Sequence, residues 1–240
     1  LTTTERIDLF HAWGEAAKES GITFIAHIGH NSLPDAQALA EAAHAVGAEA
    51  IGAMAPTFFK PADARVLVNW FAGITEPASG LPFYFYDIPS MTGVSIDTKE
   101  FVQSAGERIP SFAGVKYTNP DRDQLQAILA LENHSPDILW GCDEELLDGL
   151  GMGCQGAVGS SYNFAAGIYH RVIEAFELGD KDGAKHWQSR SVALIDTLKS
   201  HGYMHSAKAV MEMVGVDCGP ARPPLPQLTE EERSALRAQL

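Results

Sequence analysis

Two spacings of hydrophobic residues alternate along the chain as far as residue 180. Short apolar runs predict strands at 22–28, 50–54, 82–87, 112–118, 137–141 and 156–160. Hydrophobic residues at helical spacing follow each run and predict helices at 34–46, 62–74, 97–105, 121–131, 144–150 and 164–178. Strands and helices that alternate with short connections indicate right-handed βαβ units on a parallel sheet.

Both ends of the chain carry helices without strands. Thr2 followed by Glu5 is a capping-box pattern that predicts a helix at the start of the chain. After residue 180 the strand pattern stops, and helices are predicted at 187–198, 206–214 and 230–240, the last with its own capping box at Thr229 and Glu232. We therefore expect a (β/α) barrel portion over residues 1–180 and C-terminal helices over residues 181–240.

Polar residues at the strand ends distinguish two α/β architectures. His27, Tyr86, Lys116, Asp143 and Ser160 each lie at or just after the C-terminal end of a predicted strand. In a doubly wound open sheet, only the strands at a switch point carry such groups. A barrel instead gathers groups from all its strands at one mouth. The pattern therefore favours an α/β fold of the (β/α)8 TIM-barrel type.

The composition is that of a globular protein: 240 residues, 45% of them hydrophobic and 20% charged. The formal net charge of −14 argues against a nucleic-acid or anionic-membrane surface, because both require a basic patch. We therefore expect a small-molecule partner, with no nucleic acid and no membrane.

Cysteine use and the N-terminal sequence bear on location. Cys142, Cys154 and Cys218 are odd in number and form no CxxC pair, which fits reduced thiols better than a disulfide framework. We see no signal-peptide pattern and no apolar run near the roughly 20 residues of a membrane helix. Asn133-His134-Ser135 matches the glycosylation sequon, but so short a motif arises by chance. We expect a cytoplasmic protein.

Lys116 is a lone amine near the end of the apolar strand at 112–118, on the same face as Gly114 and Thr118. Burial lowers the pKa of a lysine and leaves a neutral, nucleophilic amine, from which Schiff bases form. A lysine at a strand end can also extend its amine into solvent. The strand alone leaves both interpretations open.

Other polar residues near the strand ends can transfer protons or bind a substrate beside such an amine. Tyr86 ends the strand before that of Lys116, and a phenol beside an amine suits proton transfer during imine formation and carbon–carbon cleavage; an aromatic core position is the alternative. Asp143 and Glu144 can accept hydrogen bonds from sugar hydroxyls or cap the next helix. Ser160 can hold an anionic or polyol group.

Two further motifs are interpreted as structural. Gly151-x-Gly153-x-x-Gly156 matches the dinucleotide-binding expression, but it precedes a strand instead of opening a helix, so we interpret it as a helix-to-strand turn. His27-x-x-His30 lacks the spacing and the glutamate of a zinc protease, and no metal site is predicted.

Four motifs together resemble a known enzyme family. They are YDIPSMTGV at 86–94, GVKYT at 114–118, GCDE at 141–144 and GAVGSSYNF at 156–164. In this order they are similar to the N-acetylneuraminate lyases of the dihydrodipicolinate synthase/N-acetylneuraminate lyase superfamily. The resemblance covers essentially the whole chain.

The resemblance implies a class I, Schiff-base aldolase on a (β/α)8 barrel with extra C-terminal helices, usually a homotetramer. It implies reversible cleavage of N-acetylneuraminate to N-acetylmannosamine and pyruvate, without a metal or an organic cofactor. Lys116 would form the imine with the keto carbon, and Tyr86 would be the acid/base. The residues that would line the sugar-chain pocket are Thr118, Gly141, Asp143, Glu144 and Ser160.

Two positions differ from the pattern of dihydrodipicolinate synthases and reduce the number of alternative functions. Dihydrodipicolinate synthases carry an arginine for a substrate carboxylate where this chain has Met91, and a tyrosine where it has Phe58. Both differences favour a lyase, and adjacent carboxylates favour a polyhydroxylated substrate. The remaining alternatives are another pyruvate-dependent aldolase, acting on 2-keto-3-deoxy sugar acids or resembling the synthase, and an inactive ligand-binding relative. Intact Lys116 and Tyr86 argue against the last.

Family members begin with a strand, a helix and a second strand, whose terminal loop holds the pyruvate carboxylate. This chain is expected to start at the helix after that loop and so to lack the first two strands. Six strands are fewer than the eight of a closed barrel. A chain without the loop is expected to have weak activity or none.

Overall fold

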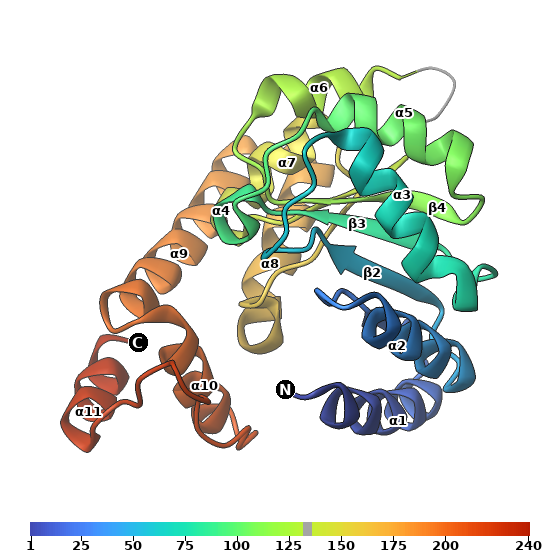
Figure 1. The fold of residues 1–240 in the computed structure, drawn as a ribbon. Coiled ribbons are helices and arrows are strands. Elements are labelled where there is room, and N and C mark those ends of the chain that lie inside the picture. The colour runs from blue at the N-terminus through green and yellow to red at the C-terminus, as the bar shows by residue number, and fades with distance from the viewer. Residues whose placement is uncertain (132–135) are drawn as a thin grey trace. The chain divides into compact units, whose positions relative to one another are not determined.

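The computed structural model describes residues 1–131 and 136–240, and the sequon at 133–135 falls outside them (Figure 1). The described residues form two compact units, Leu1–Leu139 and Trp140–Leu240. One strand, β5, begins in the first unit and ends at the first residue of the second.

The first unit alternates strands and helices. Its strands are β1 (Ile25–His27), β2 (Ala50–Met54), β3 (Phe83–Asp87), β4 (Phe112–Tyr117) and β5 (Asp137–Trp140). Its helices are α1 (Thr3–Ser20), α2 (Leu33–Ala45), α3 (Ala64–Thr75), the short 3-10 helix η1 (Glu76–Ala78), α4 (Pro89–Thr92), α5 (Thr98–Arg108) and α6 (Arg122–Leu129).

The second unit is mainly helical. It contains η2 (Asp143–Glu145), α7 (Leu146–Met152), the short strand β6 (Gly156–Ala157), α8 (Tyr162–Glu177), α9 (Lys181–Ser200), α10 (Tyr203–Met213) and α11 (Glu230–Gln239). The C-terminal helices enclose a small apolar core that includes Leu198, Val210 and Leu236.

The strands follow one another in sequence order across the sheet. β1 to β4 pair in parallel, each with the next, and β5 and β6 continue the order. At the last step, the N–H of Val158 donates to the carbonyl of Trp140 at 2.9 Å. The predicted parallel sheet of six strands is confirmed for the described residues. Strands in sequence order are expected where short crossovers join parallel neighbours.

Aromatic residues fill the core between the sheet and the helices of the first unit. Phe83 and Phe85 alternate with half-buried residues along β3. The Phe85 ring packs against Phe71 of α3 and Phe101 of α5, with ring centres 5.4 and 4.5 Å apart. In β4, Val115 is fully buried. Because side chains alternate across a strand, the other face of β3 and β4 is left for polar residues.

Several predicted boundaries hold and others are wrong. The strand predicted at 22–28 covers only Ile25–His27, and the helix predicted at 206–214 begins at Tyr203. Both predicted capping boxes are present. The helix predicted at 187–198 begins earlier, at Lys181, because the Asp180 side chain accepts the N–H of Gly183 at 2.9 Å and caps it. The strand predicted at 156–160 is shorter, because β6 covers only Gly156–Ala157, with one further hydrogen bond from Val158 to Trp140.

The glycine motif at 151–156 is a helix-to-strand turn, as predicted. Gly153 ends α7 with φ of +104°, a left-handed conformation that favours glycine. Gly156 then begins β6. The motif opens no helix, so it lacks the context of a dinucleotide loop.

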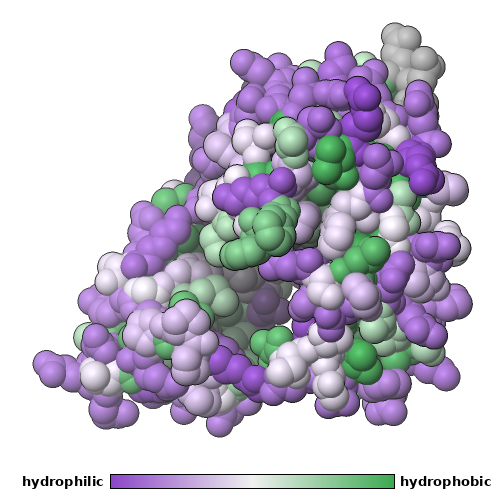
Figure 2. Space-filling view, in the orientation of Figure 1, coloured by the Kyte–Doolittle hydropathy of each residue, from purple (hydrophilic) through white to green (hydrophobic). Residues whose placement is uncertain are grey.

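Much of the surface seen in Figure 2 is hydrophilic. On the face shown in Figure 2, hydrophobic side chains form small groups separated by hydrophilic ones. Within the described ranges, no helix combines the length and the apolar character that crossing a bilayer demands.

Gly114 of β4 has no space for a side chain. A Cβ there would stand 2.1 Å from the carbonyl oxygen of Asp137 in β5, and this obstacle is backbone. We expect Gly114→Ala to force the two strands apart and lower the free energy of unfolding by about 3 kcal/mol, measured by urea denaturation. The control is Gly151→Ala in α7, where no described atom lies within 4 Å; an equal loss in both variants would contradict the expectation.

Candidate active site

Tyr86 and Lys116 lie side by side at the C-terminal ends of two adjacent parallel strands. They are direct partners in the register of β3 and β4. The Lys116 Nζ stands over the Tyr86 ring, 3.8 Å from the ring centre, in a cation–π contact. Both side chains are half-buried. The structure thus places side by side the two residues that the sequence analysis predicts as nucleophile and acid/base.

One extra residue in β4 sets this pairing. Phe83 pairs with Phe112, but the next residue of β3 pairs with Gly114, so Ala113 is bulged out of the register. Beyond the bulge, Lys116 falls on the same sheet face as the tyrosine beside it. The bulge therefore fixes which side chains of β4 face the tyrosine.

Asp87, the residue after Tyr86, fixes the ends of both strands. It is 3% exposed, and its carboxylate accepts hydrogen bonds from Thr98 Oγ1 and Asn119 Nδ2, both at 3.0 Å. Its carbonyl accepts the N–H of Thr118 at 2.9 Å. Burial raises the pKa of Asp87, while the two hydrogen bonds act in the opposite direction. These contacts hold the strand ends that carry the candidate residues.

Thr118 presents a hydroxyl beside the end of β4. Its Oγ1 is buried and has no hydrogen-bond partner among the described residues. A buried hydroxyl without a partner costs free energy, so this atom is available to a bound ligand. That Thr118 contacts substrate stays a prediction from the sequence.

His27, at the end of β1, is held as a neutral imidazole. Its Nε2 accepts the N–H of Met54 at 3.3 Å. Burial, followed by the nearby charges of Arg6 and Lys116, lowers the pKa of His27 to about 4. The imidazole therefore supports the end of β2 and carries no charge at neutral pH.

Arg6 of α1 is a residue that the sequence analysis missed. Its guanidinium donates to the carbonyls of Gly29, at 2.9 Å, and of His27. It thereby ties the first helix to the loop after β1. An arginine on one face of a helix gives no sign of such a contact, because the contact depends on how the helix packs.

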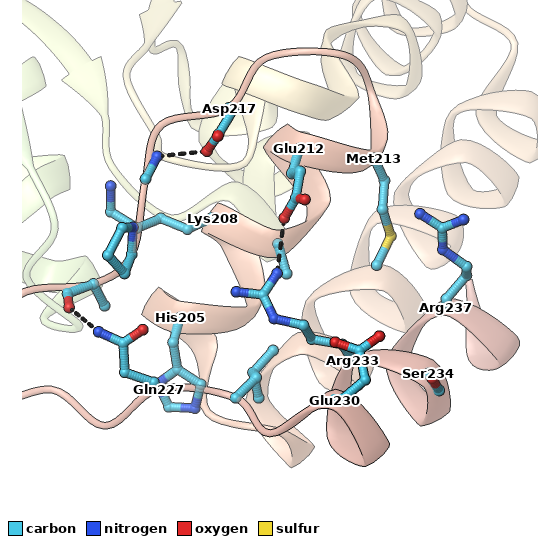
Figure 3. Close-up of a pocket in the computed structure, with 15 residues that line it drawn as sticks. His205, Lys208, Glu212, Met213, Asp217, Gln227, Glu230, Arg233, Ser234 and Arg237 are labelled. Carbon is cyan, nitrogen blue, oxygen red and sulfur yellow. Dashed lines mark hydrogen bonds and ion pairs between the residues drawn. The ribbon is translucent and has the colours of Figure 1, made fainter.

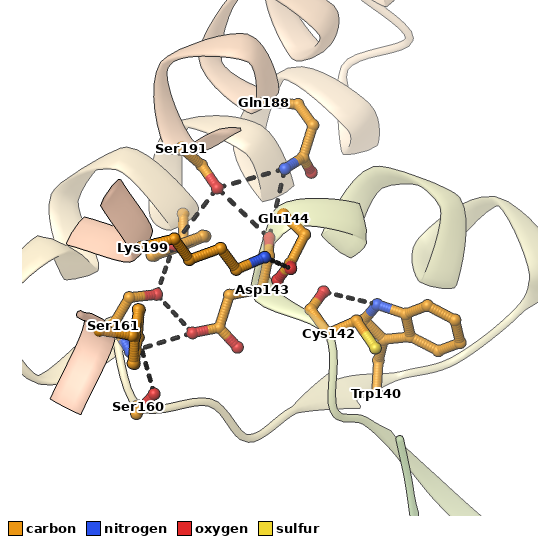
Figure 4. A network of polar contacts seen from close by, with 11 residues as sticks. Trp140, Cys142, Asp143, Glu144, Ser160, Ser161, Gln188, Ser191 and Lys199 are labelled. Carbon is orange, nitrogen blue, oxygen red and sulfur yellow. Dashed lines mark hydrogen bonds and ion pairs between the residues drawn. The ribbon is translucent and has the colours of Figure 1, made fainter. Parts of the chain in front are cut away.

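The second unit contains a buried polar network centred on Asp143 (Figure 4). Asp143 is 5% exposed, and its Oδ2 accepts both the N–H of Ser161, at 2.9 Å, and the Ser161 hydroxyl. The same hydroxyl bonds to the Tyr169 hydroxyl. Gly159 lies so close that a Cβ there would stand 1.5 Å from Asp143 Oδ1. The carboxylate joins the end of β5 to the start of α8.

Glu144 and Ser160 are more accessible than Asp143, and each has a partner from the C-terminal helices. Lys199 Nζ donates to Glu144 Oε1 at 2.6 Å. The Ser160 hydroxyl bonds to the Tyr203 hydroxyl at 2.7 Å. The sequence analysis missed Lys199 and Tyr203, because the two pairs are separated by 55 and 43 positions in the chain.

The sequence-predicted residues fall into two groups. Tyr86, Lys116 and Thr118 belong to the first unit, and the other group belongs to the second unit: Gly141, Asp143, Glu144 and Ser160. The carboxylate of Asp143 is engaged with Ser161 and does not cap α7, whose N-cap residue is Glu145.

A cavity of about 610 Å³ lies elsewhere in the second unit, among α10, α11 and the segment between them (Figure 3). Several of its polar side chains have partners within the second unit. Arg233 pairs with Glu212 at 2.7 Å, and Lys208 donates to the carbonyl of Cys218 at 3.0 Å. None of the sequence-predicted residues lines it, so its size alone does not make it the candidate site.

Two exposed side chains mark the positions that distinguish the alternatives. Met91 is 74% exposed on α4, and Phe58 is 77% exposed after β2. The Phe58 ring meets that of Phe59 edge-on, with centres 4.9 Å apart. Neither side chain can supply the charge or the hydroxyl expected at these positions in a synthase.

A family model described as the dihydrodipicolinate synthetase family matches residues 1–240. N-acetylneuraminate lyase of Rattus norvegicus is 34% identical over 243 residues, covering 100% of this chain and 76% of that protein. N-acetylneuraminate lyase of Danio rerio is 36% identical over 228 residues, covering 94% of this chain and 74% of that protein.

The fold matches that of a solved relative. The structure of Proteus mirabilis N-acetylneuraminate lyase aligns with a TM-score of 0.95 at 34% identity. The alignment covers 100% of this chain and 80% of that one. The arrangement of strands and helices is therefore the one found in that enzyme.

The pH dependence of the free energy of unfolding tests whether His27 is buried as a neutral imidazole. Its pKa falls from 6.5 in the unfolded chain to about 4 in the fold, so the unfolded chain binds more protons between these values. Stability from this group is complete above pH 6.5 and declines by about 3 kcal/mol as the pH falls to 4. We expect His27→Gln to lack this part of the decline in the free energy of unfolding, measured by urea denaturation from pH 4 to 7.

The control for this test is His11→Gln on an exposed position of α1. It should keep the pH dependence of the parent. If the two variants lose stability with pH in the same way, His27 is not the group responsible.

Proposed function

The chain belongs to the dihydrodipicolinate synthetase family, and we propose that it is a class I aldolase that reversibly cleaves N-acetylneuraminate to N-acetylmannosamine and pyruvate. The observation that carries this proposal is the Lys116 amine over the Tyr86 ring at the ends of adjacent strands. Relatives named N-acetylneuraminate lyase, 34–36% identical to this chain, support the choice of substrate.

The reaction needs one nucleophile and one proton carrier. After giving up a proton, the Lys116 amine attacks the C2 keto carbon of the sugar acid. The resulting carbinolamine takes a proton back as its hydroxyl leaves as water, and a protonated imine forms. When the C4 hydroxyl gives up its proton, the C3–C4 bond breaks and its electron pair moves into the imine to form an enamine. N-acetylmannosamine leaves as the aldehyde. Protonation of the enamine at C3 and hydrolysis then release pyruvate and restore the amine.

We assign the proton transfers to the Tyr86 hydroxyl. A proton carrier must lie within hydrogen-bond reach of the reacting groups, and the position of Tyr86 beside Lys116 supports this role. The protonated imine is itself the electron sink, so the steps call for no metal or organic cofactor. Asp87 supports the geometry by holding the strand ends in place.

We assign substrate contacts to Thr118, Gly141, Asp143, Glu144 and Ser160. The resemblance of the motifs supports all five, and the unpartnered Thr118 hydroxyl supports the first. Glu144 is suited to accept hydrogen bonds from sugar hydroxyls, and Ser160 to exchange them. Asp143 contributes chiefly by holding the backbone that carries these groups, since its carboxylate is buried against Ser161.

The motifs also support a (β/α)8 barrel that assembles as a homotetramer in the cytoplasm, with residues 1–180 as its barrel portion and 181–240 as C-terminal helices. The parallel strands in sequence order support the barrel. Size-exclusion chromatography with light scattering of the purified protein measures the assembly.

Two alternative functions predict different results with these substrates. Another pyruvate-dependent aldolase would prefer a 2-keto-3-deoxy sugar acid or, if synthase-like, an aldehyde other than N-acetylmannosamine. An inactive ligand-binding relative would form no imine. Comparing steady-state kcat/KM for N-acetylneuraminate and for 2-keto-3-deoxy sugar acids tests the first, and a higher value for the latter would overturn the proposed substrate.

Lys116→Ala tests the nucleophile. We expect borohydride to trap pyruvate on Lys116 of the parent protein and not on the variant, because the variant has no amine at this position. Lyase turnover should fall by about 10⁴-fold or more. Intact-protein and peptide mass spectrometry identify the adduct.

The matched control is Lys99→Ala, which removes an exposed lysine of α5 in the same unit. It should retain the adduct and the turnover. Trapping of pyruvate on a residue other than Lys116 would refute the assignment.

Tyr86→Phe tests the proton carrier separately from the nucleophile. Because the amine remains, we expect the pyruvate adduct to form, while kcat falls by about 10²- to 10⁴-fold. The control is Tyr84→Phe, on the same face of β3, whose hydroxyl bonds to Asp137 at 3.0 Å. Equal kcat values for the two variants would rule out Tyr86 as the acid/base.

A further inference from the structure

We propose that the corner between α9 and α10 positions the two residues that meet the sugar chain: Lys199 holds Glu144, and Tyr203 holds Ser160. This inference rests on the proposed function, because it concerns the substrate contacts of that site. Lys199 and Tyr203 are positioning residues, each acting through the residue that it holds.

The contact between Lys199 and Glu144 is a short, charge-assisted hydrogen bond. The Nζ to Oε1 distance is 2.6 Å, and the two side chains are 52% and 36% exposed. Exposed ion pairs add little to stability. The contact does, however, restrict where the Glu144 carboxylate lies, and a fixed acceptor binds a hydroxyl with less loss of conformational entropy.

The helix that carries Lys199 also fixes the backbone on both sides of Glu144. Gln188 Oε1 accepts the N–H of Leu147 at 2.8 Å, and Gln188 Nε2 donates to the carbonyl of Asp143 at 3.2 Å. Ser191 Oγ donates to the same carbonyl at 3.3 Å. The backbone of Asp143 and Leu147 is therefore bound to α9, independently of the contact between Lys199 and the Glu144 side chain.

These contacts come from one face of α9. Gln188, Ser191 and Lys199 are spaced at i, i+3 and i+11, which places them along a single stripe of an α-helix. Ile195, at i+7 on the same stripe, is 2% exposed and anchors it in the apolar interior. The stripe acts as a rigid support, and Lys199 is its last residue.

Tyr203 fixes the second contact from the start of α10. Its ring packs against the apolar core that includes Leu198 and Leu236. Its hydroxyl lies 2.7 Å from Ser160 Oγ. Either hydroxyl can donate in this contact; because a phenol is the stronger donor, we infer that Tyr203 donates, which leaves the Ser160 hydrogen for a ligand.

The corner therefore prepares a complementary pair of groups. Glu144 is held as an acceptor and Ser160 as a donor, and a polyhydroxylated chain supplies both partners. Partial burial acts to raise the pKa of Glu144, but the hydrogen bond from Lys199, a backbone hydrogen bond and the charge of Lys199 together outweigh it, and the pKa lies below its usual value. Tyr162 and Tyr203 also face this carboxylate.

Lys199→Met in the purified protein tests the first contact. We expect KM for N-acetylneuraminate to rise about two- to fivefold, with little change in kcat and none in the pyruvate concentration that half-saturates borohydride trapping. The acid limb of the kcat/KM profile should move to higher pH, because the pKa of Glu144 rises without the lysine. Lys199→Arg should restore both, whereas Lys185→Met, an exposed lysine of the same helix, should match the parent.

Tyr203→Phe tests the second contact by removing only a hydroxyl. We expect KM for the sugar acid to rise about two- to tenfold, again with unchanged trapping of pyruvate. In a Glu144→Gln background, Lys199→Met should cause no further rise in KM, because Lys199 acts through Glu144. Circular dichroism and thermal unfolding confirm that each variant is folded.

The outcomes separate this inference from the proposed function. If the full-length parent protein shows neither lyase turnover nor a Lys116 adduct, the proposed function itself fails. If the parent is active but Lys199→Met behaves like Lys185→Met, or if its effect adds fully to that of Glu144→Gln, the inference is overturned while the function stands. Loss of pyruvate trapping in Lys199→Met or Tyr203→Phe would likewise overturn it, because a positioning role toward the sugar does not reach the imine.

Discussion

The register between β3 and β4 is the constraint on which the candidate chemistry depends. Phe85 and Val115 must face the apolar helices, and the bulge at Ala113 lets both strands satisfy this requirement while Lys116 meets Tyr86 on the opposite face. A slip of one residue would turn the lysine into the core and a hydrophobic residue toward the ligand. The burial of the aromatic residues thus determines where the amine lies.

Two buried carboxylates perform a similar structural task in the two units. Asp87 holds the ends of β3 and β4 by accepting from Thr98 and Asn119. Asp143 holds the segment after β5 by accepting from Ser161. In both cases neutral donors bind the acid, and its carboxylate fixes the segments that these donors belong to. The adjacent residues carry the accessible groups.

The sequence predicts well those features that depend on neighbours along the chain. Strand order, capping boxes and the juxtaposition of Tyr86 and Lys116 follow from local periodicity and from the rule that parallel strands end at one edge. The contacts of Arg6, Lys199 and Tyr203 were missed, because each joins segments whose packing no local pattern specifies. For Asp143, the sequence could not distinguish a sugar ligand from a helix cap. In the fold its carboxylate does not cap α7 and accepts from Ser161, 18 positions away, while its contact with a sugar stays a prediction.

The stripe on α9 has a consequence for how such an enzyme diversifies. Glu144 and Ser160 receive their support from Lys199 and Tyr203, which lie outside the strands that carry Lys116 and Tyr86. If Glu144 and Ser160 bind the sugar as proposed, substitutions of Lys199 and Tyr203 alter the preference for a sugar without changing Lys116 and Tyr86. A randomised library confined to this corner samples new acceptor substrates with the aldol chemistry intact.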